Sequence, residues 1–274
     1  MKPEIERVPI LRLTEQDRCE IEDTVVTEIS LTIILDGQEL TTLLCSPTKL
    51  EYLAIGFLCS EGLIKSKDEI KKMTVDDQRG VAWLESEQGK EFAAGRLLKR
   101  VVTSGGLRRA SLHGDADAQS QAKIESGVEI SAREVFSLVS EFQNRSPVFK
   151  ATGGVHSAAL CDTKGILVFS EDIGRHNAID KVFGECVLTD IPTDDRIILS
   201  SGRIASEILL KAAKRNIPII ISVAPPTDLA VRLAGDLGVT LVGFVREGRM
   251  NVYTHGWRVR MDYTTRQSRA RVPG

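Results

Sequence analysis

The sequence lacks the features that define several large protein classes. No apolar run approaches the roughly 20 residues that a membrane-spanning helix needs, and aromatic residues make up only 5% of the chain. Neither sign of charge is in excess, because 36 lysines and arginines face 38 aspartates and glutamates. The resulting net charge of -2 gives no overall attraction to nucleic acid. We therefore expect neither a membrane protein nor a nucleic-acid-binding protein.

Cysteine is scarce, and its spacing is irregular. The chain has five cysteines and no CxxC motif, which fits reduced thiols better than disulfides or a zinc site. Four of them lie in apolar segments, where core packing is the expected role: Cys45, Cys59, Cys161 and Cys186. Cys19 lies in the polar segment EQDRCEIED and is expected to be the most exposed. The first residues are too charged for a signal peptide, so we expect a cytoplasmic protein.

Several catalytic signatures are also missing. A zinc-dependent nucleobase deaminase needs HxE and PCxxC, and the chain has neither. It also lacks GxGxxG after a predicted strand and GxxxxGK[ST], which argues against Rossmann and P-loop nucleotide binding. We therefore expect no metal site.

The first part of the chain is predicted to be β-rich. Residues 25–45 form two β-type runs joined by Asp36-Gly37, a strong hairpin signal. A helical pattern follows over 48–64, and a further strand is predicted near 81–84. We predict a small β-rich domain over residues 1–99. The polar, aperiodic segment 100–127 is predicted to be a flexible loop between domains.

The second part alternates between helix and strand. A capping box at Ser131 and Glu134 starts the first helix. The periodicity then predicts strands over 156–160, 166–169, 196–199, 217–223, 239–245 and 250–255, with helices over 176–187, 204–214 and 228–237. This order predicts an α/β domain over 128–256 that begins with an antiparallel hairpin. Residues 257–274, which carry five arginines, are predicted to be a solvated basic tail.

Residues capable of chemistry gather where the predicted strands end. Ligands of open α/β sheets bind beyond the carboxyl ends of the parallel strands, so these residues are expected to share one edge. Gly153, Gly154 and His156 lie where the first strand begins. The candidates that follow the later strands are Asp172, Gly174, Arg175, His176, Ser200, Ser201, Gly202, Arg203, Arg246, Gly248 and Arg249.

Each of these motifs also has a purely structural interpretation. Backbone N–H groups, two hydroxyls and a guanidinium in Ser200-Ser201-Gly202-Arg203 suit a phosphate, but the serines can equally cap the next helix. Asp172 and His176, with His156, suit acid and base catalysis, but they also suit an ion-paired helix end. An unrelated small-molecule enzyme therefore remains an alternative.

Taken together, long blocks of the sequence resemble the FdhD/NarQ family of formate dehydrogenase accessory proteins. These blocks are LTTLLCSPTKLEYLAIGFLCSEGLI, TGGVHSAAL, EDIGRHNAIDK, LSSGRIASEILLKAA, SVAPPTDLAV and LVGFVREGRMNVYTH. The resemblance implies a cytoplasmic homodimer with mixed α+β architecture. It also implies that the second domain is a three-layer, cytidine-deaminase-like domain that lacks the zinc site.

The resemblance also implies a function. Family members pass sulfur from a cysteine desulfurase to the molybdenum cofactor, bis-molybdopterin guanine dinucleotide, before its insertion into the formate dehydrogenase apoenzyme. GDP is then expected to be a partial mimic of that cargo. The cofactor-binding stretch of the family corresponds here to Phe244, Val245, Arg246, Glu247, Gly248 and Arg249.

The chain departs from the family in the loop between the domains. The persulfide-carrying cysteine of the family is expected near Gly106, where this sequence reads VTSGGLRRAS and has no cysteine. Only a thiol can carry a persulfide. Two hypotheses follow. In the first, the protein transfers sulfur, and either another thiol, such as Cys19, or a partner protein carries the persulfide. In the second, the protein is a non-catalytic chaperone that binds the cofactor or a guanine nucleotide.

Overall fold

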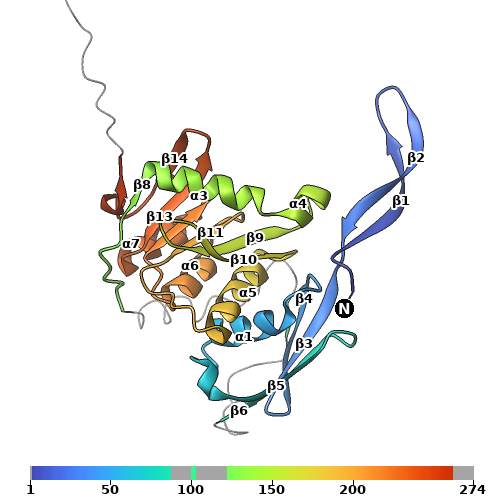
Figure 1. The fold of residues 1–274 in the computed structure, drawn as a ribbon, viewed down its shortest axis with the longest axis horizontal. Helices are drawn as coiled ribbons and strands as arrows, with labels where there is room; N and C mark the ends of the chain where they lie inside the picture. Colours follow the sequence, from blue (N-terminus) through green and yellow to red (C-terminus); the bar gives the residue numbers. More distant parts are fainter. Residues whose placement is uncertain (1, 88–99, 103–121, 262–274) are drawn as a thin grey trace, which may run out of the picture.

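The computed structural model describes residues 2–87, 100–102 and 122–261 and has mixed α and β structure. Within these residues lie a five-stranded sheet, a six-stranded sheet and two small two-stranded sheets (Figure 1). The segment around Gly106 lies outside the described residues, as do most of 100–127 and the end of the tail. The predicted domain boundaries therefore stay a prediction.

The five-stranded sheet has the order β5-β6-β3-β4-β7. Its strands are β3 (Ile29–Leu35), β4 (Gln38–Cys45), β5 (Ile70–Asp76), β6 (Val81–Ser86) and β7 (Arg100–Val102). The predicted hairpin turn is confirmed: Asp36 and Gly37 have φ of 51° and 81°, as a type I′ turn requires. Helix α1 (Leu50–Ser60) covers one face of the sheet, and the short helix η1 spans Lys67–Glu69.

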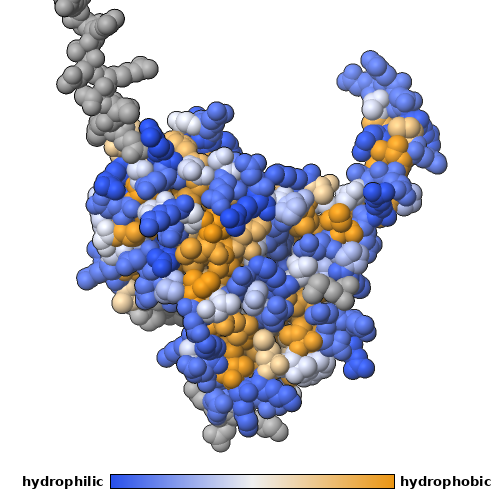
Figure 2. All heavy atoms as spheres, viewed as in Figure 1, coloured by the Kyte–Doolittle hydropathy of each residue, from blue (hydrophilic) through white to orange (hydrophobic). Residues whose placement is uncertain are grey.

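A separate hairpin precedes this sheet and was not predicted. Strands β1 (Ile5–Leu13) and β2 (Arg18–Val26) pair only with each other, and their tip projects away from the rest of the chain (Figure 1). Charged and apolar residues are interspersed on both strands, and apolar ones form a small patch between hydrophilic neighbours (Figure 2). Because neither strand has one continuous apolar face, the usual strand signal is weak.

The six-stranded sheet has the order β10-β9-β11-β12-β13-β14. Its strands are β9 (His156–Cys161), β10 (Ile166–Asp172), β11 (Ile197–Ser200), β12 (Ile219–Ser222), β13 (Thr240–Arg246) and β14 (Arg249–Val252). Strands β11, β12 and β13 are parallel, and β9 is antiparallel to both β10 and β11. Strand β10 therefore runs in the same direction as these three, and the alternating α/β pattern with its initial hairpin is confirmed.

Helices cover both faces of this sheet. Helix α3 (Ala132–Asn144) packs on one face, while α5 (Arg175–Leu188), α6 (Ser206–Ala213) and α7 (Asp228–Leu237) pack on the other. The capping box at Ser131 and Glu134 is present at the start of α3. A short helix, α4 (Pro147–Thr152), follows α3 and leads into β9. Helix α6 begins at Ser206, two residues later than predicted.

The C-terminal segment corrects part of the predicted tail. The short helix η2 (Gly256–Arg258) is followed by β15 (Val259–Arg260), which pairs with β8 (Ile130–Ser131). Arg258 is only 2% exposed and donates to the carbonyl oxygens of Gly238 and Ser126. Arg258 therefore holds the C-terminal segment against the rest of the fold and does not lie in solvent.

The two larger sheets are joined by a close contact between α1 and α5. A Cβ on Gly56 would lie 1.7 Å from the backbone oxygen of Asp180, and one on Gly184 would lie 1.8 Å from that of Tyr52. Only glycine lets the two helix backbones approach so closely.

No helix in the described part of the chain is long and apolar enough to span a bilayer.

Candidate functional site

The predicted edge of the six-stranded sheet brings the candidate segments together. Strands β10, β11, β12 and β13 run in one direction and end at this edge. The antiparallel strands β9 and β14 begin there. The register pairs Asp172 with His156 and Arg246 with Arg249. The segments named from sequence therefore lie side by side along one edge, in the order of the strands.

Histidine and arginine side chains meet at the β9 and β11 part of the edge. We call His156, Arg175, His176, Ser201 and Arg203 the His-Arg cluster. The His156 Nδ1 lies 3.4 Å from the Ser201 Oγ. A Cβ on Gly202 would lie 2.9 Å from the Arg175 Cβ and 3.4 Å from the His156 Nδ1. The absent side chain of Gly202 therefore leaves room for both neighbours to converge.

Two buried polar atoms of the cluster have no hydrogen-bond partner among the described residues. They are the Nε of Arg175 and the Nε2 of His176. His176 is only 8% exposed. Buried polar atoms left without partners are rare in folded proteins and need an explanation, such as a ligand-binding role. Both atoms are nitrogens that can donate a hydrogen bond to an anionic group.

Electrostatics keep the two histidines neutral. Burial, together with Lys211, Arg175 and His156, lowers the pKa of His176 to about 3. Burial and Arg175 also lower the pKa of His156. Burial and the nearby Arg203 lower the pKa of Arg175, which nevertheless remains a cation near neutral pH. The positive charge of the cluster therefore comes from Arg175 and Arg203.

Sequence reasoning missed Glu207, which belongs to the same neighbourhood. Its Oε2 lies 3.6 Å from the His176 Nε2, just beyond hydrogen-bond distance. Burial raises the pKa of the Glu207 carboxyl, although Lys211 and Arg175 oppose this effect. Glu207 lies in the block LSSGRIASEILLKAA, but no spacing rule connects it with a histidine 31 residues earlier.

The end of β13 and the turn after it form a second group at the same edge. Phe244 has φ of 53° and is 37% exposed, and the register of β13 with β14 shifts here. The Arg246 Nη1 donates to the carbonyl oxygens of Val223 and Val245, so its guanidinium lies over the end of β12. Glu247, Gly248 and Arg249 are exposed, while Val245 is buried in the core.

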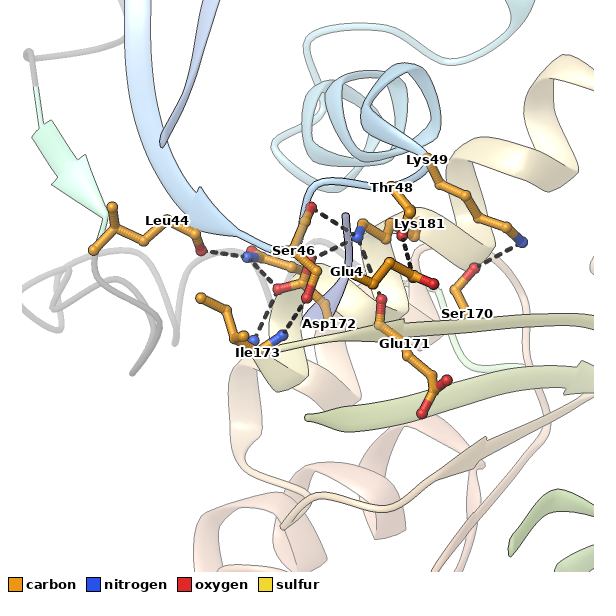
Figure 3. A network of polar contacts seen from close by, with 12 residues as sticks. Glu4, Leu44, Ser46, Thr48, Lys49, Ser170, Glu171, Asp172, Ile173 and Lys181 are labelled. Carbon is orange, nitrogen blue, oxygen red and sulfur yellow. Dashed lines mark hydrogen bonds and ion pairs between the residues drawn. The ribbon is translucent and has the colours of Figure 1, made fainter. Parts of the chain in front are cut away.

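Asp172 takes part in the interior of the fold instead. Its carboxylate is fully buried and pairs with the Lys181 Nζ at 2.8 Å (Figure 3). It also accepts from the backbone N–H groups of Ser46 and Gly174 and from the Asn177 side chain. With these partners, we do not retain Asp172 as a group that contacts a ligand.

Asp180 lies one turn after His176 on α5, but its carboxylate contacts other residues. The two carboxylate oxygens of Asp180 accept from the Ser60 Oγ at 2.6 Å and from the Lys211 Nζ at 2.5 Å. Asp180 therefore links α5 to the end of α1 and to α6. His176 faces Glu207 instead.

The remaining candidates, Ser200, Ser201, Gly153, Gly154 and Gly174, stabilise the backbone at this edge. The Ser200 Oγ accepts from the Gly202 N–H, and the Ser201 Oγ accepts from the Ser157 N–H at 2.9 Å. Gly153 has φ of 65° and ends α4, while a Cβ on Gly154 would lie 2.7 Å from the Val26 side chain. The described contacts thus give Ser200, Ser201 and the two glycines structural tasks, and Gly174 is the N-cap of α5.

No thiol belongs to the His-Arg cluster, although Cys45 lies close enough to Asp172 and Lys181 for both charges to affect its pKa. Cys45, Cys59, Cys161 and Cys186 are buried, as predicted, and Cys19 is exposed. Burial raises the pKa of Cys45 and Cys186 to about 12 and that of Cys59 to about 11, and it raises the pKa of Cys161 as well. Cys19 pairs with Arg12 near the tip of the β1 and β2 hairpin.

Comparison with known proteins gives concordant matches. The FdhD/NarQ family model matches residues 26–260. The sulfur carrier protein FdhD of Bacillus subtilis is 41% identical over 251 residues, covering 92% of this chain and 96% of that protein. The protein of the same name from Staphylococcus aureus (strain MRSA252) is 40% identical over 251 residues, covering 92% and 95%.

A solved structure also matches. The crystal structure of a protein described as a formate dehydrogenase accessory protein from Desulfotalea psychrophila superimposes with a TM-score of 0.77. The sequence identity is 26%, and the match covers 94% of this chain and 100% of that one.

Proposed function

Because this chain belongs to the FdhD/NarQ family, we propose that it acts in the maturation of formate dehydrogenase. In this role it serves the transfer of sulfur from a cysteine desulfurase to the molybdenum cofactor, before that cofactor enters the apoenzyme. The names of the relatives, sulfur carrier protein and formate dehydrogenase accessory protein, support this proposal. The cofactor, a bis-guanine dinucleotide, is the cargo of the protein.

The observation that carries the proposal is the pair of unpartnered buried atoms on Arg175 and His176. They lie next to a second arginine, Arg203, in a cluster whose histidines are neutral. Phosphate oxygens accept hydrogen bonds and carry negative charge, so a phosphate of the cargo would satisfy both groups. The residues present therefore fit the anionic part of a guanine dinucleotide.

The chain's own residues would divide the work of binding. Arg175 and Arg203 provide charge, and the neutral His176 offers a ring nitrogen to a phosphate oxygen. Phe244 and the arginines at 246 and 249 extend the site along the edge. The ion pair of Asp172 with Lys181 fixes the start of α5, on which Arg175 and His176 lie.

The arrangement of the thiols favours the chaperone as a second candidate function. A persulfide forms on a reactive thiolate, and the four buried thiols are kept protonated. Cys19 is accessible, but it lies on a hairpin whose tip projects away from the body (Figure 1). In this second reading the protein holds the cofactor while a partner carries the sulfur.

The test is formate dehydrogenase activity in a bacterial strain that lacks its own FdhD protein. Expression of this chain is expected to restore activity, and failure would remove the proposed role in maturation. A Cys19→Ser variant separates the two candidate functions. Full restoration by this variant supports the chaperone, whereas loss of restoration supports sulfur transfer through Cys19.

A further inference from the structure

A tyrosine outside the family's cofactor-binding stretch lies against the sheet at Gly243, the residue before Phe244. A Cβ on Gly243 would lie 3.1 Å from the Tyr253 Cε2 and 3.1 Å from the Pro226 Cδ. The Tyr253 ring and the Pro226 ring therefore both rest on this glycine. We call Tyr253 and Pro226, which lie against Gly243, together with the adjacent Phe244, the aromatic ledge.

Both aromatic rings of the ledge are accessible. Phe244 is 37% exposed and Tyr253 is 36% exposed, although large apolar surfaces are normally buried. The Asn251 side chain donates to the Tyr253 hydroxyl at 3.4 Å, and the Tyr253 N–H donates to the Leu241 carbonyl oxygen at 2.8 Å. The tyrosine is thus held at both its backbone and its hydroxyl, while part of its ring remains free.

The backbone at Phe244 supports a binding role for the ledge. A left-handed conformation is costly for a bulky residue and persists where the surroundings impose it, often at ligand sites. Here the Phe244 N–H donates to the Ala224 carbonyl oxygen at 3.3 Å, which ties the turn to the segment that carries Pro226. The ledge is therefore a shaped surface with contributions from β13, the residue that follows β14 and the loop after β12.

Charge beside the ledge indicates what kind of molecule it suits. Arg246 lies over the end of β12, and Arg249 pairs with it at the start of β14. A planar base attached to phosphates would place its ring on the aromatic surface and its charge near the guanidinium groups. A purely apolar partner would gain nothing from the two arginines.

We propose that Tyr253 is a base-stacking residue that holds the guanine of the nucleotide cargo against the aromatic ledge. This inference rests on the proposed function and deepens it. It assigns the guanine base to the aromatic ledge, while the arginines along the same edge of the sheet bind the phosphates. Stacking on an aromatic ring depends on the ring and not on the hydroxyl. Phenylalanine should therefore replace Tyr253, and a residue without a ring should not.

The test is the affinity of the full chain for GDP, measured by isothermal titration calorimetry. Tyr253→Ala is expected to weaken binding by about tenfold, the order of one lost stacking contact. Tyr253→Phe is expected to bind like the wild type. If the alanine variant does not fold, as judged by circular dichroism, Tyr253→Leu retains apolar volume without a ring and should show the same loss.

Trp257 provides a matched control. It is 55% exposed and stacks on Arg258, which binds Gly238 and Thr240 at the opposite end of β13. Trp257→Ala should leave GDP affinity unchanged. If the wild type binds GDP and the ringless Tyr253 variants bind equally well, the inference is overturned while the proposed function stands. If the wild type does not bind GDP, the proposed nucleotide site fails, and this inference fails with it.

Discussion

Asp172 and Lys181 form an ion pair in which both side chains are completely buried, with 2.8 Å between Oδ2 and Nζ. The pair connects the end of β10 with α5, and the Ser46 N–H and carbonyl oxygen bind its two members (Figure 3). Ser46 directly follows β4, so the same contact joins the five-stranded sheet to the edge that carries the candidate site. The position of Arg175 and His176 therefore depends on residues from both sheets.

Breaking this pair should destabilise the protein strongly. In Lys181→Met, the buried Asp172 carboxylate loses its counter-charge, and such a loss costs about 3–5 kcal/mol of unfolding free energy. Urea denaturation measures the change. Arg7→Ala is the control, because the Arg7 and Glu22 pair is exposed, and it should leave the unfolding free energy unchanged. Equal stability of the two variants would contradict the structural role of the buried pair.

The contact between α1 and α5 should not tolerate a methyl group. In Gly56→Ala the added Cβ would lie 1.7 Å from the Asp180 backbone oxygen, so the helices must separate. We expect a loss of about 3 kcal/mol or more in unfolding free energy, the upper range for overpacking. Gly127→Ala is the matched control, because no atom lies within 4 Å of its added Cβ. Unchanged stability of Gly56→Ala would show that the helices are not in this contact.

His176 should make stability depend on pH. Its pKa is about 3 in the folded chain and about 6.5 when unfolded, so the unfolded chain binds more protons between these values. Above about pH 6.5, His176 is neutral in both the folded and the unfolded chain, and its full contribution to stability is present. As the pH falls toward 3, the unfolded chain binds a proton that the folded chain does not, so the free energy of unfolding decreases. His176→Gln should therefore lose less stability than the wild type between pH 7 and pH 4, measured by thermal unfolding. Parallel pH profiles would contradict burial of the neutral ring.

Alkylation should distinguish Cys19 from the other thiols. Iodoacetamide applied to the native protein is expected to label Cys19 alone, because the other four thiols are buried and have raised pKa values. Mass spectrometry of tryptic peptides reads out each position. Cys19→Ser should abolish native labelling, while full labelling in urea serves as the positive control. Native labelling of Cys45 or Cys161 would contradict their burial.

Local patterns predicted the parts of the fold that depend on neighbouring residues. Asp36-Gly37 specified its turn, and the capping box at Ser131 specified the start of α3. The shared edge was also predictable, because alternation of strands and helices requires parallel strands whose carboxyl ends meet. The placement of Arg175, His176 and Arg203 at this edge was therefore predictable from the sequence alone.

Long-range contacts were not accessible in the same way. Asp172 resembled a ligand-binding acid, and its partner Ser46 lies 126 residues away in sequence. The approach of Glu207 to His176 depends on how α6 packs beside α5. Nothing in the sequence predicts the left-handed backbone of Phe244 either, because glycine is the usual residue in that conformation. Packing, not periodicity, decides these features.

Calorimetric titration with GDP is the most direct test of whether the His-Arg cluster binds the phosphates of a guanine nucleotide. The wild type should bind GDP, and Arg175→Gln should weaken binding by about tenfold or more, as expected for a charge-assisted contact. Arg145→Gln, which removes a surface arginine paired with Glu141 at the end of α3, should bind like the wild type. Absence of GDP binding by the wild type, or equal affinity of Arg175→Gln and wild type, would contradict the account.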